Sequence, residues 1–247
     1  MDSFQLEILY EDDDLIVINK PEGLLTHPSW LTKKGTENVA SILKQYFNGA
    51  KVFTVHRLDR ATSGALMVAK NKLTAQRLSA DFANHNVVKT YLCVVRGYAP
   101  ESATIDHPLK YQHDKKAEPF AAKDHEPQSA VTTFERLATV QLPIAVGKWT
   151  TARYSLIKAT PLTGRKHQLR RHFKHILCPI IGDTNYGEGR HNALFREHFK
   201  VNRLLLMATS LHFVHPTSGK EMIIKAPLSP QVLELFACFK WCESDYR

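Results

Sequence analysis

The stretch His56-Arg57-Leu58-Asp59-Arg60-Ala61-Thr62-Ser63-Gly64 places one carboxylate between two arginines. Residues 52–55 before it and 65–69 after it are apolar, β-branched or aromatic, as is typical of strands. Asp59 is therefore expected in a connection between two strands, where catalytic groups are often presented. Neighbouring guanidinium groups keep a carboxylate charged even where a cleft desolvates it. The plainer alternative is a surface loop whose solvated ion pairs contribute about 0–1 kcal/mol each.

These nine residues resemble a motif of the RluA-like pseudouridine synthases, H-R-L-D-R-x-T-S-G, and fill every fixed position of it. Four other segments resemble motifs of the same family and follow the family's order along the chain. They are residues 19–24 (N-K-P-x-G-L), 89–91 (K-x-Y), 164–172 (G-R-x-H-Q-L-R-x-H) and 179–187 (P-I-x-G-D-x-x-Y-G). The resemblance thus covers nearly the whole chain.

The resemblance implies roles for individual side chains. Asp59 matches the catalytic aspartate, and Arg165 matches the arginine that pairs with it. Tyr91 matches the tyrosine that packs on the extruded base and is the favoured group for removing its C5 proton. Arg57 matches the residue that enters the RNA where the base was, and Leu169 matches a position that lines the uracil pocket. For a tyrosine in a strand or a leucine on a helix, packing in the core is the simpler interpretation.

The charge of the chain favours a polyanionic partner. It has 33 lysines and arginines against 24 acidic residues, a formal charge of +9. Net charge alone is weak support, because a basic surface can serve solubility. Residues 165–175, which we expect to form a helix, contain five cations and no acidic residue. We expect Lys166, Arg170 and Arg171 in this segment to bind RNA phosphates.

The periodicity of the chain predicts an α+β fold. Predicted strands outnumber predicted helices, and many connections are short enough for antiparallel pairing. Residues 101–129 are expected to form a long irregular excursion. The resemblance implies the pseudouridine synthase fold, a long, bent, mixed but mostly antiparallel sheet with flanking helices and a central cleft. We expect residues 1–247 to form a single catalytic domain, without the N-terminal S4 domain that many relatives carry.

Composition argues against several other classes of protein. The four cysteines form no C-x-x-C pair, which argues against a disulfide framework and a zinc knuckle. The thirteen histidines lack H-E-x-x-H spacing, so we expect no metal site. The reaction that the resemblance implies involves no redox change, so we expect no cofactor. The first residues do not resemble a signal peptide, and no apolar run approaches the roughly 20 residues that cross a bilayer. We expect a cytoplasmic monomer that binds no membrane.

The predicted function is isomerisation of uridine to pseudouridine in RNA. Residues 24–30 and 137–147 most resemble family members that modify tRNA, at the uridine at the acceptor end of the T stem. A ribosomal RNA enzyme of the same family is the main alternative. A catalytically silent RNA-binding module and a metal-dependent hydrolase are the others. The sequence leaves open whether Asp59 attacks the ribose or assists departure of the base.

Overall fold

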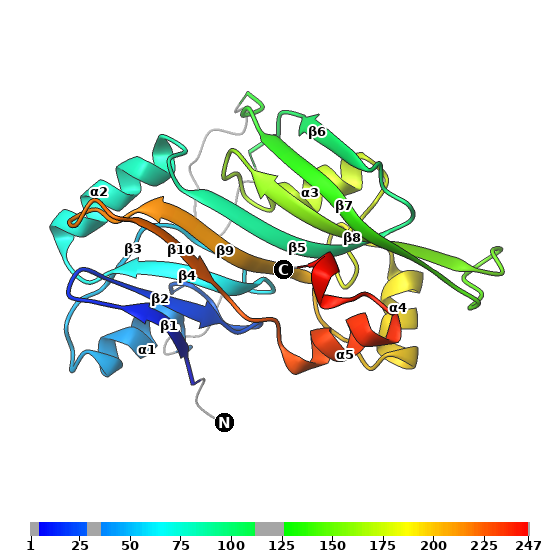
Figure 1. Cartoon of the computed structure of the whole chain (residues 1–247), viewed down its shortest axis with the longest axis horizontal. Helices are drawn as coiled ribbons and strands as arrows, with labels where there is room; N and C mark the ends of the chain where they lie inside the picture. The colour runs from blue at the N-terminus through cyan, green and yellow to red at the C-terminus, as the bar shows by residue number, and fades with distance from the viewer. Residues whose placement is uncertain (1–4, 29–35, 112–125, 247) are drawn as a thin grey trace. The chain divides into compact units, whose positions relative to one another are not determined.

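The computed structural model describes residues 5–28, 36–111 and 126–246 (Figure 1). Within them the strand pairs for which a register is defined are all antiparallel, and helices flank the strands. This confirms the predicted α+β class. The chain forms two compact units, each built from three separate segments. Unit 1 comprises Met1–Lys89, Lys110–Gln128 and Ala208–Pro227, and unit 2 comprises Thr90–Leu109, Ser129–Met207 and Leu228–Arg247. A single catalytic domain stays a prediction.

Unit 1 is built on the strand order β1-β2-β4-β9, with β3 paired to β4 and β10 paired to β9. Its elements are β1 (Glu7–Glu11), β2 (Leu15–Lys20), α1 (Val39–Tyr46), β3 (Phe53–Thr54), β4 (Ser63–Ala69), α2 (Lys72–Ala83), β9 (Leu206–Val214) and β10 (Glu221–Lys225). β2 and β4 are apolar along nearly their whole length and almost fully buried, as strands covered on both faces are. The strand that follows the Asp59 connection, β4, is thus anchored in the core.

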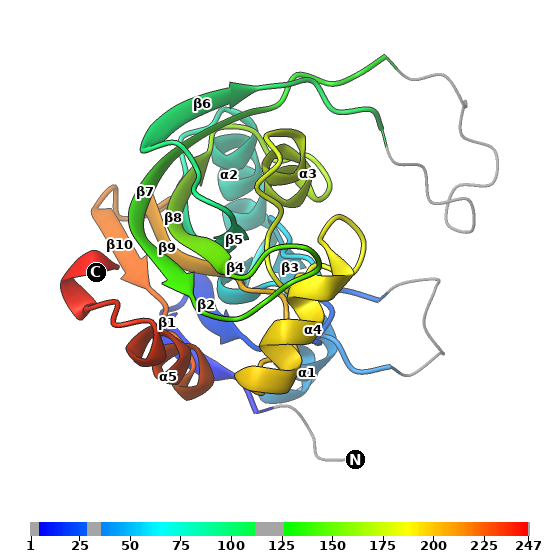
Figure 2. The same ribbon diagram turned by 90° about the vertical axis from the view of Figure 1, so that its right-hand side faces the viewer.

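Unit 2 is built on the strand order β5-β8-β7-β6. Its elements are β5 (Val88–Arg96), β6 (Ser102–Asp106), β7 (Val131–Leu142), β8 (Ala152–Pro161), α3 (Gln168–His175), α4 (Gly189–His198), α5 (Pro230–Cys238) and a 3-10 turn at Glu243–Asp245. β5 begins with two residues of unit 1, and β9 begins with two residues of unit 2. Helix α3 packs on the strands of this unit, with Phe173 against Phe134 at 5.4 Å between ring centroids (Figure 2).

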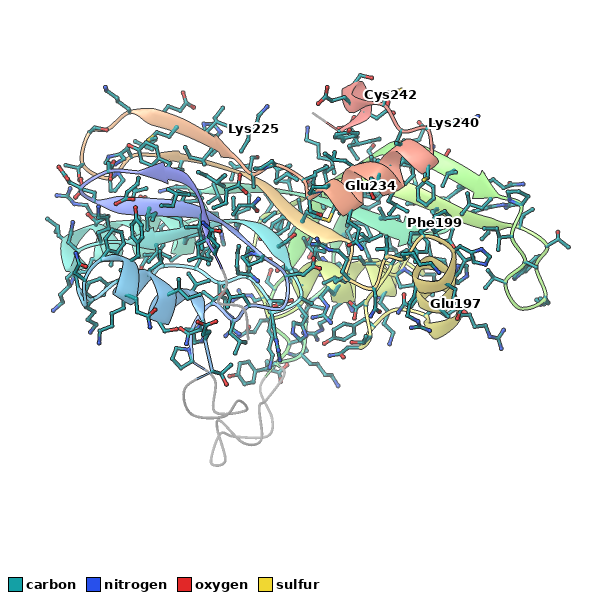
Figure 3. All side chains as sticks on the ribbon, turned by 90° about the horizontal axis from the view of Figure 1, so that it is seen from below. Glu197, Phe199, Lys225, Glu234, Lys240 and Cys242 are labelled. Carbon is teal, nitrogen blue, oxygen red and sulfur yellow. The ribbon has the colours of Figure 1, made fainter. Side chains whose placement is uncertain are left out.

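Aromatic side chains fill a hydrophobic core of unit 2. Phe199, labelled in Figure 3, lies at the end of α4. It packs edge-on against Phe239, which follows α5, at 5.1 Å between ring centroids. Tyr154 of β8 contacts Phe195 and Phe239, and it is fully buried. Such pairs contribute about 0.5–1.5 kcal/mol beyond the burial of their area. The core therefore fixes α4 and α5 against β8.

Two expectations about local structure need correction. Part of the expected excursion at residues 101–129 is the strand β6, which pairs with β7 from Ser102 to Asp106. The helix expected from Arg165 begins at Gln168, because His167 adopts a left-handed conformation with φ 55°. Residues 112–125 of the expected excursion lie outside the described residues. So do residues 29–30 of the segment 24–30, which resembles family members that modify tRNA. None of the helices described in the structure has the length and apolarity needed to cross a membrane.

Candidate active site

Asp59 lies in the connection between β3 and β4, as the sequence predicts. Its side chain is half-buried, and its carbonyl accepts a hydrogen bond from the amide of Thr62 at 3.0 Å, which closes a turn. The preceding residue, Leu58, is buried. The carboxylate is therefore carried by a short turn that is anchored in the core immediately before it.

Residues 20–24 hold this turn from one side. The fully buried Lys20 donates from Nζ to the carbonyl oxygens of Pro21 and Leu24, both at 2.8 Å, and of Arg60 at 3.3 Å. The amide of Gly23 donates to the Arg60 carbonyl at 2.8 Å, and Nε of Arg60 returns a bond to the Gly23 carbonyl, also at 2.8 Å. Lys20 and Gly23 thus fix the residue that follows Asp59.

Thr26 holds the residue that precedes Asp59. Its Oγ1 donates to the carbonyl of Leu58 at 3.0 Å and accepts from the amide of Leu58 at 3.4 Å. Both groups are buried, so removing the hydroxyl would leave polar atoms without partners, at a cost of about 1–3 kcal/mol. The backbone is therefore tied on both sides of Asp59, which fixes the point from which the carboxylate projects.

His56 and Gly64 serve the structure of the same connection. Nε2 of His56 accepts a bond from the amide of Met67 at 2.9 Å, and its ring stacks on Phe82. Burial lowers the pKa of His56 to about 3, and the Lys89 ammonium adds to the shift. The ring is therefore neutral at physiological pH. Gly64 has φ 113°, and a Cβ there would lie 2.1 Å from the carbonyl oxygen of Ala208, so only glycine fits.

Arg57 and Arg60 give this connection a positively charged surface. Both residues are exposed. Burial lowers the pKa of the nearby His27, and the charge of Arg57 lowers it further, which favours the neutral ring. Arg57 is accessible for the RNA contact that the sequence predicts. Unit 1 thus presents a fixed carboxylate flanked by exposed guanidinium groups.

Tyr91 and Arg165 belong to unit 2, whereas Asp59 belongs to unit 1. Tyr91 lies in β5, half-buried, opposite Ala159 of β8. Arg165 is exposed in the loop before α3, where its Nε donates to the carbonyl of Ser129 at 3.0 Å. Each unit therefore carries part of the predicted catalytic set.

Gln168 organises the loop that carries Arg165. Its Oε1 accepts from Thr163 Oγ1 at 2.7 Å and from the Arg165 amide at 3.0 Å. Its Nε2 donates to the Val131 carbonyl and to Thr132 Oγ1, both at 3.0 Å. The amide thereby uses its full hydrogen-bonding capacity while it is almost completely buried. This positioning role was missed from the sequence, because no periodic pattern distinguishes such a glutamine.

The predicted RNA-binding residues on α3 separate into two groups. Arg170 is buried and makes a bidentate pair with Asp183, Nε to Oδ2 at 2.7 Å and Nη2 to Oδ1 at 2.8 Å. Burial opposes the ionisation of Asp183, but Arg170 and backbone amides outweigh it and hold its pKa below the usual range. We therefore remove Arg170 from the expected phosphate contacts. Lys166 is exposed and Arg171 half-buried, and their contact with RNA stays a prediction.

Two further side chains of α3, the predicted Leu169 and the neighbouring His172, have simpler surroundings. Leu169 is buried, a position that suits either the core or the wall of a pocket. His172 is buried between Thr132 Oγ1 at 3.0 Å and the His107 carbonyl at 3.1 Å. Its hydrogen bonds are structural. Over the described residues, no group of three or more histidine, cysteine or acidic side chains is arranged to hold a metal ion.

Comparison with known proteins identifies the family. The model of the RNA pseudouridylate synthase family matches residues 14–175. The chain belongs to this family. Curated relatives include tRNA pseudouridine synthase C of Vibrio cholerae, 49% identical over 97% of this chain and 98% of the relative, and that of Haemophilus ducreyi, 47% identical over 98% and 99%. Among solved structures, human RNA Pseudouridylate Synthase Domain Containing 1 superposes with a TM-score of 0.71 at 27% identity, over 97% of this chain and 91% of that chain.

The family assignment confirms the resemblance drawn from the five motifs and the enzyme class, an RNA pseudouridine synthase. It rules out the metal-dependent hydrolase as the main activity. The matched residues include the Asp59 connection, Tyr91 and Arg165. Outside them lie α4, α5 and the last strands, β9 and β10.

Proposed function

We propose that this protein isomerises a uridine of tRNA to pseudouridine, and that its target is the uridine at the acceptor end of the T stem. The observation that carries the proposal is the connection around Asp59, where hydrogen bonds from Lys20, Gly23 and Thr26 fix the turn that carries a carboxylate within a complete family motif. Likeness over nearly the full length to relatives named for tRNA supports the choice of substrate.

The reaction needs no oxidant and no cofactor. The N-glycosidic bond between C1′ and N1 of uridine breaks, the uracil turns, and a bond forms between C1′ and C5. The proton of C5 is lost, and N1 gains a proton, so the atoms balance. Asp59 supplies the negative charge near C1′, either by attacking the ribose or by assisting departure of the base. Both routes need a carboxylate that is held in place.

We assign the other side chains to extrusion of the base, to orientation of Asp59 and to removal of the C5 proton. Tyr91 packs on the extruded base and removes the C5 proton, because a phenolic oxygen on a strand can act as a positioned base. Arg165 pairs with Asp59 and keeps it oriented and charged. Leu169 lines the uracil pocket. Arg57 fills the space that the flipped base leaves in the RNA. Extruding a base costs a few kcal/mol of stacking and pairing, which such contacts repay.

Recognition of the RNA falls to phosphate contacts from Lys166 and Arg171, both accessible in or beside α3. Duplex shape and backbone charge are the features that structured RNA offers to a protein surface. We propose further that the enzyme works as a cytoplasmic monomer and needs no metal or other cofactor.

Incubation of the purified protein, treated with EDTA, with a full tRNA transcript and with 23S RNA tests the proposal. Carbodiimide mapping then locates any pseudouridine. We expect one modified uridine, at the acceptor end of the tRNA T stem, and none in the ribosomal RNA. Modification confined to 23S RNA would make the ribosomal alternative correct. Tight binding of tRNA without modification of either RNA would favour a silent binding module.

A further inference from the structure

We infer that the tip of the β7–β8 hairpin is a second RNA-binding surface, on which the Trp149 ring stacks against an accessible base of the tRNA. The inference rests on the proposed function, because it takes RNA as the ligand. The surface lies outside the five family motifs. Trp149 is 66% exposed, and its neighbour Lys148 is also exposed. Figure 1 shows β7 and β8 continuing together toward this tip.

The turn that presents Trp149 is tight. Val146 and Trp149 exchange both backbone bonds, from the amide of Val146 at 2.9 Å and from that of Trp149 at 3.2 Å. Gly147 has φ 61°, as the first central residue of a type II′ turn requires. A Cβ on Gly147 would lie 2.6 Å from Nη1 of Arg190, so this guanidinium packs directly against the turn. The indole is therefore held on a fixed backbone beside a cation.

Cations accompany the aromatic rings along this hairpin. Nζ of Lys148 lies 5.2 Å from the centroid of the Trp149 ring. On β8, the guanidinium carbon of Arg153 lies 5.4 Å from the centroid of Tyr98. Tyr98 lies in the connection between β5 and β6 and is 45% exposed. A ring with a cation at one face can receive a base at its other face, and both contacts are favourable in complexes with single-stranded RNA. Tyr98 and Arg153 extend the surface down the hairpin.

The local charge selects RNA over an apolar or protein partner. Between Glu135 and Asp183 the chain contains nine lysines and arginines and no acidic residue. The hairpin tip therefore has cations of its own and no carboxylate in sequence to neutralise them. An exposed indole among cations matches what a base and its phosphate need, a stacking face and a positive charge. An apolar partner would desolvate Lys148 and Arg153 and offer them no negative charge in exchange.

Substitution of Trp149 separates stacking from catalysis. We expect Trp149→Ala to weaken equilibrium binding of the full tRNA about tenfold, the order expected when a base loses its aromatic partner. Trp149→Phe should keep most of the affinity, because its ring can still stack. The single-turnover rate at saturating tRNA should be unchanged in both. Tyr46→Ala is the matched control, since Tyr46 is a 53% exposed aromatic in unit 1 whose hydroxyl bonds Glu11.

Tryptophan fluorescence reports the contact directly. We expect tRNA to quench the wild-type emission, and the quench to shrink strongly in Trp149→Phe, which retains Trp30 and the buried Trp241. An undiminished quench in Trp149→Phe, or tRNA affinity of Trp149→Ala equal to that of wild type, would overturn the inference. So would equal losses in the Ala and Phe variants. A protein that shows the Trp149-dependent quench but forms no pseudouridine would contradict the proposed function and leave this surface established.

Discussion

The buried ammonium of Lys20 donates to the carbonyl oxygen of Arg60 at 3.3 Å, one residue after the carboxylate that we propose does the chemistry. The same ammonium also donates to the carbonyls of Pro21 and Leu24. Burying an ammonium is costly unless it is hydrogen-bonded, and here the carbonyl oxygens of three residues compensate for that cost. Lys20 is a positioning residue for Asp59.

Lys20→Met should lower kcat by roughly 10-fold to 100-fold, about 1.4–2.8 kcal/mol in activation free energy, while tRNA affinity stays within a few fold. The methionine fills the space but leaves the Arg60 carbonyl without this donor. Steady-state kinetics measure kcat, and filter binding of the same tRNA measures the affinity. Lys70→Met is the control, because it removes an ion pair with Glu11 in the same unit and should leave kcat unchanged. Equal losses in both variants would mean that Lys20 acts only through general stability.

His56 should make the protein less stable in mild acid. Its pKa in the folded state, about 3, lies below the ordinary 6.5. Between these values the unfolded chain binds a proton that the folded chain does not, so stability falls as pH decreases through this window. At pH 5 the loss attributable to His56 is at most about 2 kcal/mol. Urea unfolding at pH 5 and pH 7 measures it. His56→Gln should show a smaller difference between the two pH values than wild type, and an equal difference would exclude His56 as the source.

Substitution of Arg170 should lower folding stability, whereas substitution of Lys166 should change only the binding of RNA. Arg170→Met leaves the Asp183 carboxylate buried without its partner, which costs about 3–5 kcal/mol of folding stability. Lys166→Ala should leave stability unchanged and reduce the slope of log K against log salt by about 0.7–0.9, as loss of one phosphate contact does. Thermal unfolding and tRNA titrations at several salt concentrations test both. A reduced salt slope in Arg170→Met that still folds would restore Arg170 as a phosphate contact.

Tyr91→Phe should bind tRNA normally and stall after the glycosidic bond is broken. The ring still packs on the base, but the phenolic oxygen that takes the C5 proton is absent. Tritium release from C5-labelled tRNA, compared with filter binding of the same RNA, separates the steps. Tritium release at the wild-type rate would reduce Tyr91 to a packing residue.

The sequence predicted the parts of this fold that follow from periodicity. Runs of apolar, β-branched and aromatic residues located the strands that flank Asp59. The helix near residue 165 begins later than predicted, because the left-handed His167 interrupts the backbone while leaving the apolar spacing unchanged. β6 was missed, since its residues are largely polar and its strand state depends on pairing with β7.

The candidate site was likewise only partly predictable from the sequence. The motif located Asp59, but the buried bonds of Lys20, Thr26 and Gln168 join segments distant in sequence, which no local pattern reveals. Arg170 illustrates the reverse error. In a basic segment every arginine suggests a phosphate contact, and only the packing of Asp183 against it shows that this one is an internal ion pair.

The central claim is that the Asp59 carboxylate performs the isomerisation. Asp59→Asn keeps the size and shape of the side chain and removes its charge, while the exposed cations that bind phosphate are untouched. Single-turnover tritium release from C5-labelled tRNA, with saturating enzyme, is the direct measurement. We expect no release above background by the Asn variant and tRNA affinity within a few fold of wild type. Substantial turnover by Asp59→Asn would contradict the account.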